Sequence, residues 1–166
     1  MNSGTITIFL VMLAVASIEA GLCESSARGT ESSKQHEFSL NLKVEGRSTF
    51  VTLSSNITTR PLKLLIDCGA TLSLVASDVI KPGAVDESHR EIVYGCENRD
   101  IETLGLAHVM ISLKGNRNID IQMHVMNRTN IRPNCDGYLG FDVMVKYNMT
   151  VDLDKHKLIF RFSREE

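Results

Sequence analysis

An acidic residue at the end of an apolar run is the feature of this sequence that most clearly could take part in a chemical reaction. The run Leu62–Ile66 leads directly into Asp67, and Gly69 follows two places later. Strand interiors disfavour aspartate, so a carboxylate there needs hydrogen bonds, a charged partner or a functional reason. Glycine permits a tight turn and lets another chain or a ligand approach closely. On its own, the triplet also fits a plain turn at a strand end, so its meaning depends on the elements around it.

Those elements are predicted to be short β-strands. From Phe38 onward, apolar residues alternate with polar ones, and the segments are separated by turn residues. The predicted strands are Phe38–Val44, Thr49–Leu53, Leu62–Ile66, Leu72–Ser77, Glu91–Tyr94, Ile101–Leu106, Ala107–Leu113, Ile119–Met126, Val151–Leu153 and Leu158–Phe162. One short helix is expected at Asp142–Tyr147. This spacing favours a single all-β domain, either a closed barrel or a sandwich.

The first residues are typical of a secretory leader. Ile6–Ile18 is an uncharged apolar run, and Ala20 is a small residue suited to a cleavage site. We therefore expect a signal peptide at 1–20, a polar flexible linker at 21–36, the domain at 37–162 and a tail at 163–166. The alternative is that Ile6–Ile18 is a helix or strand of the fold. A leader implies the secretory pathway, whereas the protein is intracellular if this segment is an artefact of the gene model.

Composition excludes several other classes. Eighteen Lys and Arg residues against 20 Asp and Glu give a net charge of −2, which disfavours nucleic-acid binding. No apolar run is long enough for a stable membrane span. Four cysteines are too sparse for a disulfide scaffold, and five scattered histidines predict no metal site. If the chain is secreted, Cys96 and Cys135 could form a disulfide. Asn-x-Ser/Thr triplets at Asn56, Asn127 and Asn148 are candidate glycosylation acceptors in a secreted chain.

Two motifs, in the same order along the chain, resemble those of the retroviral and retrotransposon-type aspartic proteases, the retropepsin-like family. The first is the apolar run ending in Asp67-Cys68-Gly69-Ala70. The second is Asp136–Met144, which resembles the apolar-apolar-glycine element of that family and the short helix after it. Tyr94–Leu106 lies where the family has its flap. The resemblance covers roughly Phe38 to Phe162.

The resemblance implies an aspartic endopeptidase without a cofactor. Asp67 would be the catalytic aspartate, and each subunit supplies only one, so activity requires an obligate homodimer. Two carboxylates held close together share a proton at acidic to mildly acidic pH, activate a water and cleave a peptide or protein substrate. The remaining implied roles are substrate contact by Cys68, Gly69 and Ala70, loop support by Leu139 and Gly140, and a flap at Gly95, Cys96, Glu97 and Asn98. The resemblance also suggests Phe38–Val44 and Leu158–Phe162 as strands of the dimer sheet.

The sequence also departs from the pattern of this family. Cys68 stands where the family has Thr or Ser, whose hydroxyl hydrogen-bonds across the dimer axis; a thiol makes weaker hydrogen bonds. Thr71 and Phe141 replace an Asp and an Arg that pair in viral members. The loss of both charges together is a trait of many retrotransposon members, whereas Cys68 and the leader keep an inactive alternative open, and two alternatives are considered. One is a catalytically inactive retropepsin fold that dimerises or binds peptides, and the other is an unrelated secreted β-sandwich that binds a ligand.

Overall fold

A computed structural model of the chain describes residues 36–95, 100–113 and 117–162. These residues lie within one compact unit. The predicted leader at 1–20, all but the last residue of the predicted linker at 21–36, and the tail at 163–166 lie outside the described residues.

The described chain is built from β-strands, one short α-helix and two single turns of 3-10 helix. The strands are β1 His36–Glu45, β2 Ser48–Leu53, β3 Leu62–Ile66, β4 Leu74–Ala76, β5 Ile92–Tyr94, β6 Asp100–Glu102, β7 Gly105–Leu113, β8 Arg117–Met126, β9 Gly137–Leu139, β10 Thr150–Asp152 and β11 Lys157–Phe162. The 3-10 turns are η1 Ser77–Val79 and η2 Arg128–Asn130, and the helix is α1 Phe141–Lys146. The predicted all-β class with one short helix is confirmed.

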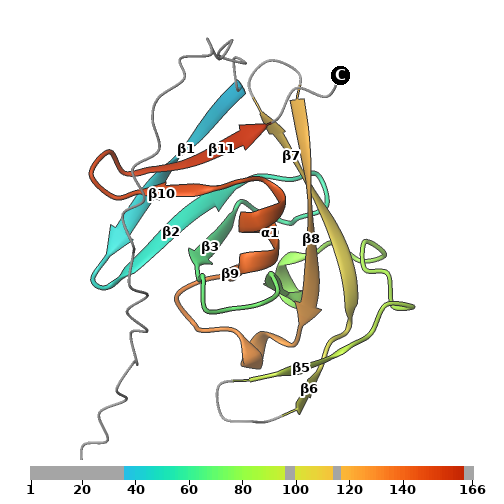
Figure 1. The fold of residues 1–166 in the computed structure, drawn as a ribbon. Coiled ribbons are helices and arrows are strands. Elements are labelled where there is room, and N and C mark those ends of the chain that lie inside the picture. The colour runs from blue at the N-terminus through green and yellow to red at the C-terminus, as the bar shows by residue number, and fades with distance from the viewer. Residues whose placement is uncertain (1–35, 96–99, 114–116, 163–166) are drawn as a thin grey trace, which may run out of the picture. The chain divides into compact units, whose positions relative to one another are not determined.

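Nine strands form one sheet in the order β10-β11-β1-β2-β3-β9-β4-β8-β7, and β5 and β6 form a separate hairpin (Figure 1). Most neighbours run antiparallel, but β9 runs parallel to β3 and antiparallel to β4. The short β9 therefore sits between two strands that come much earlier in the sequence. This insertion brings the second sequence motif against the first.

One hydrophobic core holds the sheet together. The largest fully buried side chains come from β2, β3, β8, β9 and β11, which are spread across the sheet. They include Phe50, Leu62, Leu64, Ile121, Met123, Leu139 and Phe160. The alternation of the sequence explains this placement, because every second residue of a strand points to the same face. Burying side chains of this size contributes about 1.5–3 kcal/mol each.

Some predicted boundaries were wrong. Ile101–Leu106 was predicted as one strand, but β6 ends at Glu102 and Gly105 already begins β7. Gly105 has φ of 142°, and a Cβ there would lie 2.4 Å from the Asp86 carbonyl oxygen. The main chain therefore turns between the two strands at a position where only glycine fits.

The strand predicted at Leu72–Ser77 is shorter than expected. β4 begins only at Leu74, and Ser77 already belongs to η1. The β9 strand was not predicted at all, because three residues starting with glycine carry no visible alternation. Only its tertiary contacts with β3 and β4 make it a strand.

Candidate active site

Asp67 lies in a tight turn directly after β3. Its main-chain N–H donates to the Leu139 carbonyl (N···O 3.0 Å), which extends the ladder between β3 and β9 by one residue. Its Oδ1 accepts a hydrogen bond from Gly69 N–H at 3.0 Å, and its carbonyl accepts one from Ala70 N–H at 3.1 Å. The Asp67 side chain is half-buried, whereas Cys68 and Gly69 are exposed. The turn thus presents a carboxylate beside exposed main chain.

The residues predicted to support this loop lie underneath it. Leu139 is fully buried, and a Cβ on Gly140 would lie 2.6 Å from the Leu72 carbonyl oxygen and 2.9 Å from that of Ala70. Phe141 N–H donates to the Ala70 carbonyl at 2.8 Å. The start of α1 therefore holds the loop from below, and the close approach requires glycine at position 140.

A second support, which the sequence analysis missed, joins Ser73 to Asp142. Asp142 accepts hydrogen bonds from Ser73 N–H (3.0 Å) and from Ser73 Oγ (2.7 Å). Ser73 Oγ accepts in turn from Gly140 N–H at 2.9 Å, and Ser73 is fully buried. The sequence predicted only a helix-terminus role for Asp142. A buried serine within an apolar stretch was the available signal, since buried hydroxyls require partners.

Tyr138 lies on the same side of the sheet as Asp67. It pairs with Leu65 across the parallel β3–β9 ladder, and Asp67 follows Leu65 by two residues. Burial is the largest cause that raises the pKa of the Tyr138 hydroxyl, and the negative charge of Asp67 acts in the same direction. The neutral hydroxyl accepts a hydrogen bond from Arg132 N–H at 3.0 Å. Tyr138 thus anchors the segment before β9 beside the candidate carboxylate.

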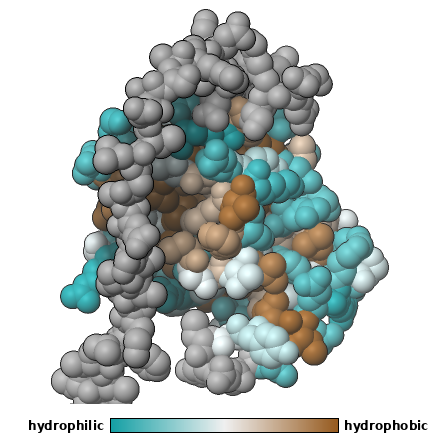
Figure 2. Space-filling view, viewed as in Figure 1, coloured by the Kyte–Doolittle hydropathy of each residue, from teal (hydrophilic) through white to brown (hydrophobic). Residues whose placement is uncertain are grey.

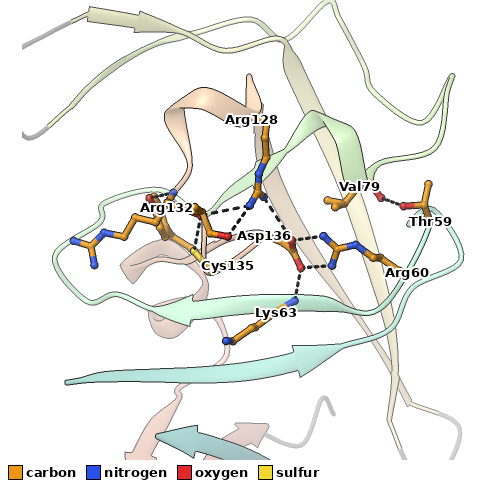
Figure 3. A network of polar contacts seen from close by, with 10 residues as sticks. Thr59, Arg60, Lys63, Val79, Arg128, Arg132, Cys135 and Asp136 are labelled. Carbon is orange, nitrogen blue, oxygen red and sulfur yellow. Dashed lines mark hydrogen bonds and ion pairs between the residues drawn. The ribbon is translucent and has the colours of Figure 1, made fainter. Parts of the chain in front are cut away.

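A network around Asp136 holds the entry to β9 (Figure 3). Arg60 donates to both Asp136 oxygens, at 2.6 and 2.7 Å, and Lys63 N–H donates to one of them at 2.9 Å. Arg128 Nη1 lies 3.5 Å from Asp136 Oδ1. The main chain of Asp136 also bridges β3 and β4, through bonds with Lys63 O and Ala76 N. Asp136 therefore fixes β9 in the place where it can support Asp67.

The charge of Asp136 is stable because it is paired. Burial raises the pKa of the Asp136 carboxyl, but the hydrogen bonds from Arg60 and from Lys63 N–H, with the charges of Arg60 and Arg128, outweigh burial and hold it below its ordinary value. A bidentate arginine is the strongest common partner for a carboxylate. The sequence analysis used Asp136 only as part of a motif and gave it no partner, since Arg60 lies 76 residues away.

The described cysteines differ in accessibility. Cys68 is a free and exposed thiol, whereas Cys135 is free and buried. Burial raises the pKa of the Cys135 thiol, which makes it a poor nucleophile. Cys96, its possible disulfide partner in the sequence analysis, lies outside the described residues.

The other predicted positions are spread over the surface. Asn56, Asn127 and Asn148 are all exposed. Gly95 follows the end of β5, but Cys96, Glu97 and Asn98 of the predicted flap lie outside the described residues. The proposed dimer strands β1 and β11 pair with each other within one chain, with Phe38 opposite Phe160.

The described residues contain neither a group of side chains that could hold a metal ion nor a helix that could span a membrane. In that part of the chain, no three His, Cys, Asp or Glu side chains are grouped closely enough to hold a metal ion. None of its helices has the length and apolar character needed to cross a bilayer.

The tip of the Asp67 loop, at Cys68 and Gly69, is exposed. A cavity of about 390 Å³ lies between β6 and the η2 region, but its lining, which includes Glu102, Leu104 and Asn127, contains no residue of the Asp67 loop. On the face seen in Figure 2, hydrophobic residues gather in the middle of the view, where α1 lies in Figure 1. Phe141 and Val145 are the exposed apolar residues of α1, with 55% and 62% of their surface accessible.

Comparisons with known proteins found one curated relative and several solved structures. No family model matches the chain. It is 24% identical over 120 residues to the retrovirus-related Pol polyprotein from transposon 412 of Drosophila melanogaster; the match covers 72% of this chain but only 9% of that polyprotein.

Two crystal structures are similar in outline. A retropepsin-like aspartic protease from Rickettsia conorii is 14% identical with a TM-score of 0.43, covering 78% of this chain and 92% of that one. The retroviral protease-like domain of Ddi1 from Leishmania major is 17% identical with a TM-score of 0.46. The match covers 70% of this chain and 95% of that domain's chain. The sequence match to a retrovirus-related Pol polyprotein confirms the resemblance to the retropepsin-like family that the two sequence motifs predict.

Proposed function

We propose that this chain is an aspartic-type endopeptidase that acts as a homodimer, with Asp67 as the catalytic residue of each subunit. The observation that carries the proposal is the position of Asp67, a half-buried carboxylate in a turn braced by β9 and α1 beside exposed main chain. Among the described residues, no cation pairs with this carboxylate. Asp67 Oδ1 accepts a main-chain hydrogen bond from Gly69 within its own turn, whereas the structural carboxylate Asp136 is bound by a bidentate arginine.

The need for a second copy follows from the chemistry. Hydrolysis by carboxylates needs one group that takes a proton from water and another that gives a proton to the carbonyl oxygen. The nearby carboxylates Asp136 and Asp142 are both engaged, with Arg60 and with Ser73. A second Asp67 from another copy supplies the missing group, and the open loop surface leaves room for it.

In the proposed reaction, the two Asp67 carboxylates hold one proton between them. The ionised member takes a proton from a bound water, whose oxygen attacks the scissile peptide carbonyl. The protonated member donates to the carbonyl oxygen, and collapse of the tetrahedral intermediate releases the amine with a proton. Gly69 offers its main-chain carbonyl to an extended substrate, which binds in the manner of an added β-strand. No cofactor takes part in these steps.

The test is peptide cleavage by the full chain between about pH 4 and 6. Asp67→Asn is expected to lower the cleavage rate by about a thousandfold or more, because it removes the proton-transfer group. Asp154→Asn, which makes the same change of charge at an exposed turn, is the matched control and keeps the activity. Equal cleavage by wild type and Asp67→Asn contradicts the proposal.

The second candidate is the same fold without catalysis, serving as a dimerisation or peptide-binding module. The observation that favours it is Cys68, an exposed thiol in the position where the family has a hydroxyl. This candidate predicts that the chain dimerises and binds peptides without cleaving them, and that Asp67→Asn leaves both properties unchanged.

A further inference from the structure

A buried histidine whose ring nitrogen Nδ1 has no hydrogen-bond partner lies near the root of the β5–β6 hairpin. The side chain of His124, in β8, has 11% of its surface accessible. Its ring nitrogen Nδ1 is buried and has no hydrogen-bond partner among the described residues. The carboxylate oxygen Oε2 of Glu91 lies 3.9 Å from that nitrogen, too far for a hydrogen bond. An unpartnered polar atom in this setting is costly, so it needs an explanation.

Glu91 is one of the two residues that close the root of the hairpin. Thr103 N–H donates to the Glu91 carbonyl at 2.8 Å, and Glu91 N–H donates to Thr103 Oγ1 at 2.9 Å. Thr103 is fully buried, and the next residue, Leu104, bonds to Val125 in β8. Glu91 immediately precedes β5, and Thr103 immediately follows β6. Whatever fixes Glu91 against β8 therefore also fixes both arms of the hairpin.

His124 also contacts the support of the Asp67 loop. Its main-chain N–H donates to the Ser73 carbonyl at 2.9 Å. Ser73 in turn binds Asp142 and Gly140 below the loop. The residue His124 thus joins the loop support through its main chain and approaches the hairpin root through its ring.

We propose that protonation of His124 completes an ion pair with Glu91, which fixes the root of the β5–β6 hairpin at mildly acidic pH. A proton from solvent converts the ring to an imidazolium, in which both nitrogens are donors, so Nδ1 gains a partner in Glu91. The Glu91 side chain is 57% exposed and free to rotate across the gap. Histidine as a side-chain type changes charge between about pH 5 and 8, a range in which glutamate side chains in general are ionised.

The other charged groups around His124 already have partners. Asp86 bridges to Leu106, which lies opposite His124 in the β7–β8 ladder, but its carboxylate binds Ser88 and His89. Asp120, on the same strand as His124, binds His108. The neighbour of Glu91, Arg90, binds Glu87. Leu74 in β4, which lies opposite His124 on the other side, carries no charge. Among the described residues, Glu91 is the carboxylate found within 4 Å of the His124 ring.

The test is hydrogen exchange of the hairpin amides in the full chain, corrected for intrinsic rates, at about pH 5.5 and 7.5. Protection at Val93 and Ile101 is expected to be about threefold to fivefold higher at the lower pH, the scale of a partly exposed ion pair. Glu91→Gln and His124→Gln abolish this difference. Glu91→Gln changes an exposed side chain, so it tests the pair even if His124→Gln does not fold.

Two controls separate this pair from its neighbours. Glu87→Gln and His89→Gln remove charges of the same kinds nearby and keep the pH-dependent protection. A wild type without pH-dependent protection, or a Glu91→Gln variant that keeps it, overturns the proposal. Any benefit to substrate binding rests on the proposed function, but the exchange measurement does not, so an inactive protein can still satisfy it.

Discussion

Asp67 is held by main-chain contacts rather than by cations. Its N–H is bound by Leu139, and its Oδ1 receives the N–H of Gly69. This arrangement fixes the direction of the carboxylate while leaving it available to a substrate or to a second copy. Gly140 follows from the same need, since a glycine there admits the close approach of the Leu72 and Ala70 carbonyls.

Two glycines of the site should respond differently to a methyl group. In Gly140→Ala the added carbon meets carbonyl oxygens of Leu72 and Ala70 within 3 Å, so we expect a loss of at least about 2 kcal/mol in unfolding free energy. In Gly69→Ala the added carbon meets only Asp67 Oδ1, at 3.3 Å, so stability changes little. Urea unfolding of both variants measures this, and equal stabilities would show that the start of α1 does not pack closely against the loop.

Cys68 is the residue that most directly tunes the proposed dimer. In Cys68→Thr a hydroxyl replaces a weakly bonding thiol, so we expect tighter association by about fivefold or a higher cleavage rate. Cys68→Val, which has a similar size without hydrogen-bonding groups, is the control and gives no gain. Sedimentation and peptide cleavage measure the two effects, and no change in either for Cys68→Thr refutes the role of this position.

At the scale of elements, the decisive feature is β9, a three-residue strand held by a charged network at its start. Asp136 contributes its carboxylate to Arg60 and its main chain to both β3 and β4. The strand has too few residues to be stable by its own propensity. Its place between β3 and β4 therefore depends on these contacts and on the burial of Leu139.

Removal of the Asp136 charge should destabilise the fold in a pH-dependent way. Asp136→Asn is expected to lower the free energy of unfolding by about 2 kcal/mol at neutral pH, because it leaves Arg60 and Arg128 without their carboxylate. Because the pKa of Asp136 is lower in the folded chain than in the unfolded one, this stabilisation is complete above the ordinary value of about 3.9. It disappears as the pH falls through the lowered pKa, where the carboxylate is protonated in both states.

Urea unfolding of wild type and Asp136→Asn at neutral pH and at about pH 3 measures the difference. The gap between the two proteins should be smaller at the acidic pH. Glu87→Gln, at an exposed ion pair with Arg90, is the control with little effect at either pH. A gap that does not shrink in acid would mean that the carboxylate is not the source of the stabilisation.

The elements that could be predicted from the sequence are those with regular alternation. β1, β2, β3, β7, β8 and α1 lie within a residue or two of their predicted ranges, since their apolar residues repeat with the period of the element. β9 and the break at Gly105 could not be predicted, because both are set by contacts with distant main chain. The same holds within the site, where the place of Asp67 at the end of β3 was predicted from local sequence, but the partners of Ser73, Tyr138 and Asp136 were not.

At the scale of the whole molecule, the account depends on two copies of the Asp67 loop meeting. Of the two cysteines in the described part of the chain, Cys68 is the exposed one, and it follows the Asp67 carboxylate directly. In a dimer built as proposed, the two Cys68 side chains face each other near the symmetry axis. A disulfide forms only when the two Cα atoms lie within about 7 Å. A disulfide between the two Cys68 residues would therefore show that the two Asp67 loops lie next to each other.

The most direct measurement is therefore oxidative cross-linking through Cys68 in a full chain whose Cys23, Cys96 and Cys135 are replaced by Ser. The account predicts a covalent dimer that forms under mild oxidation, disappears with reductant, and is absent when Cys68 is also replaced by Ser. Sedimentation under the same conditions establishes whether the chain is dimeric before oxidation. A dimer in solution that fails to cross-link through Cys68 contradicts the account.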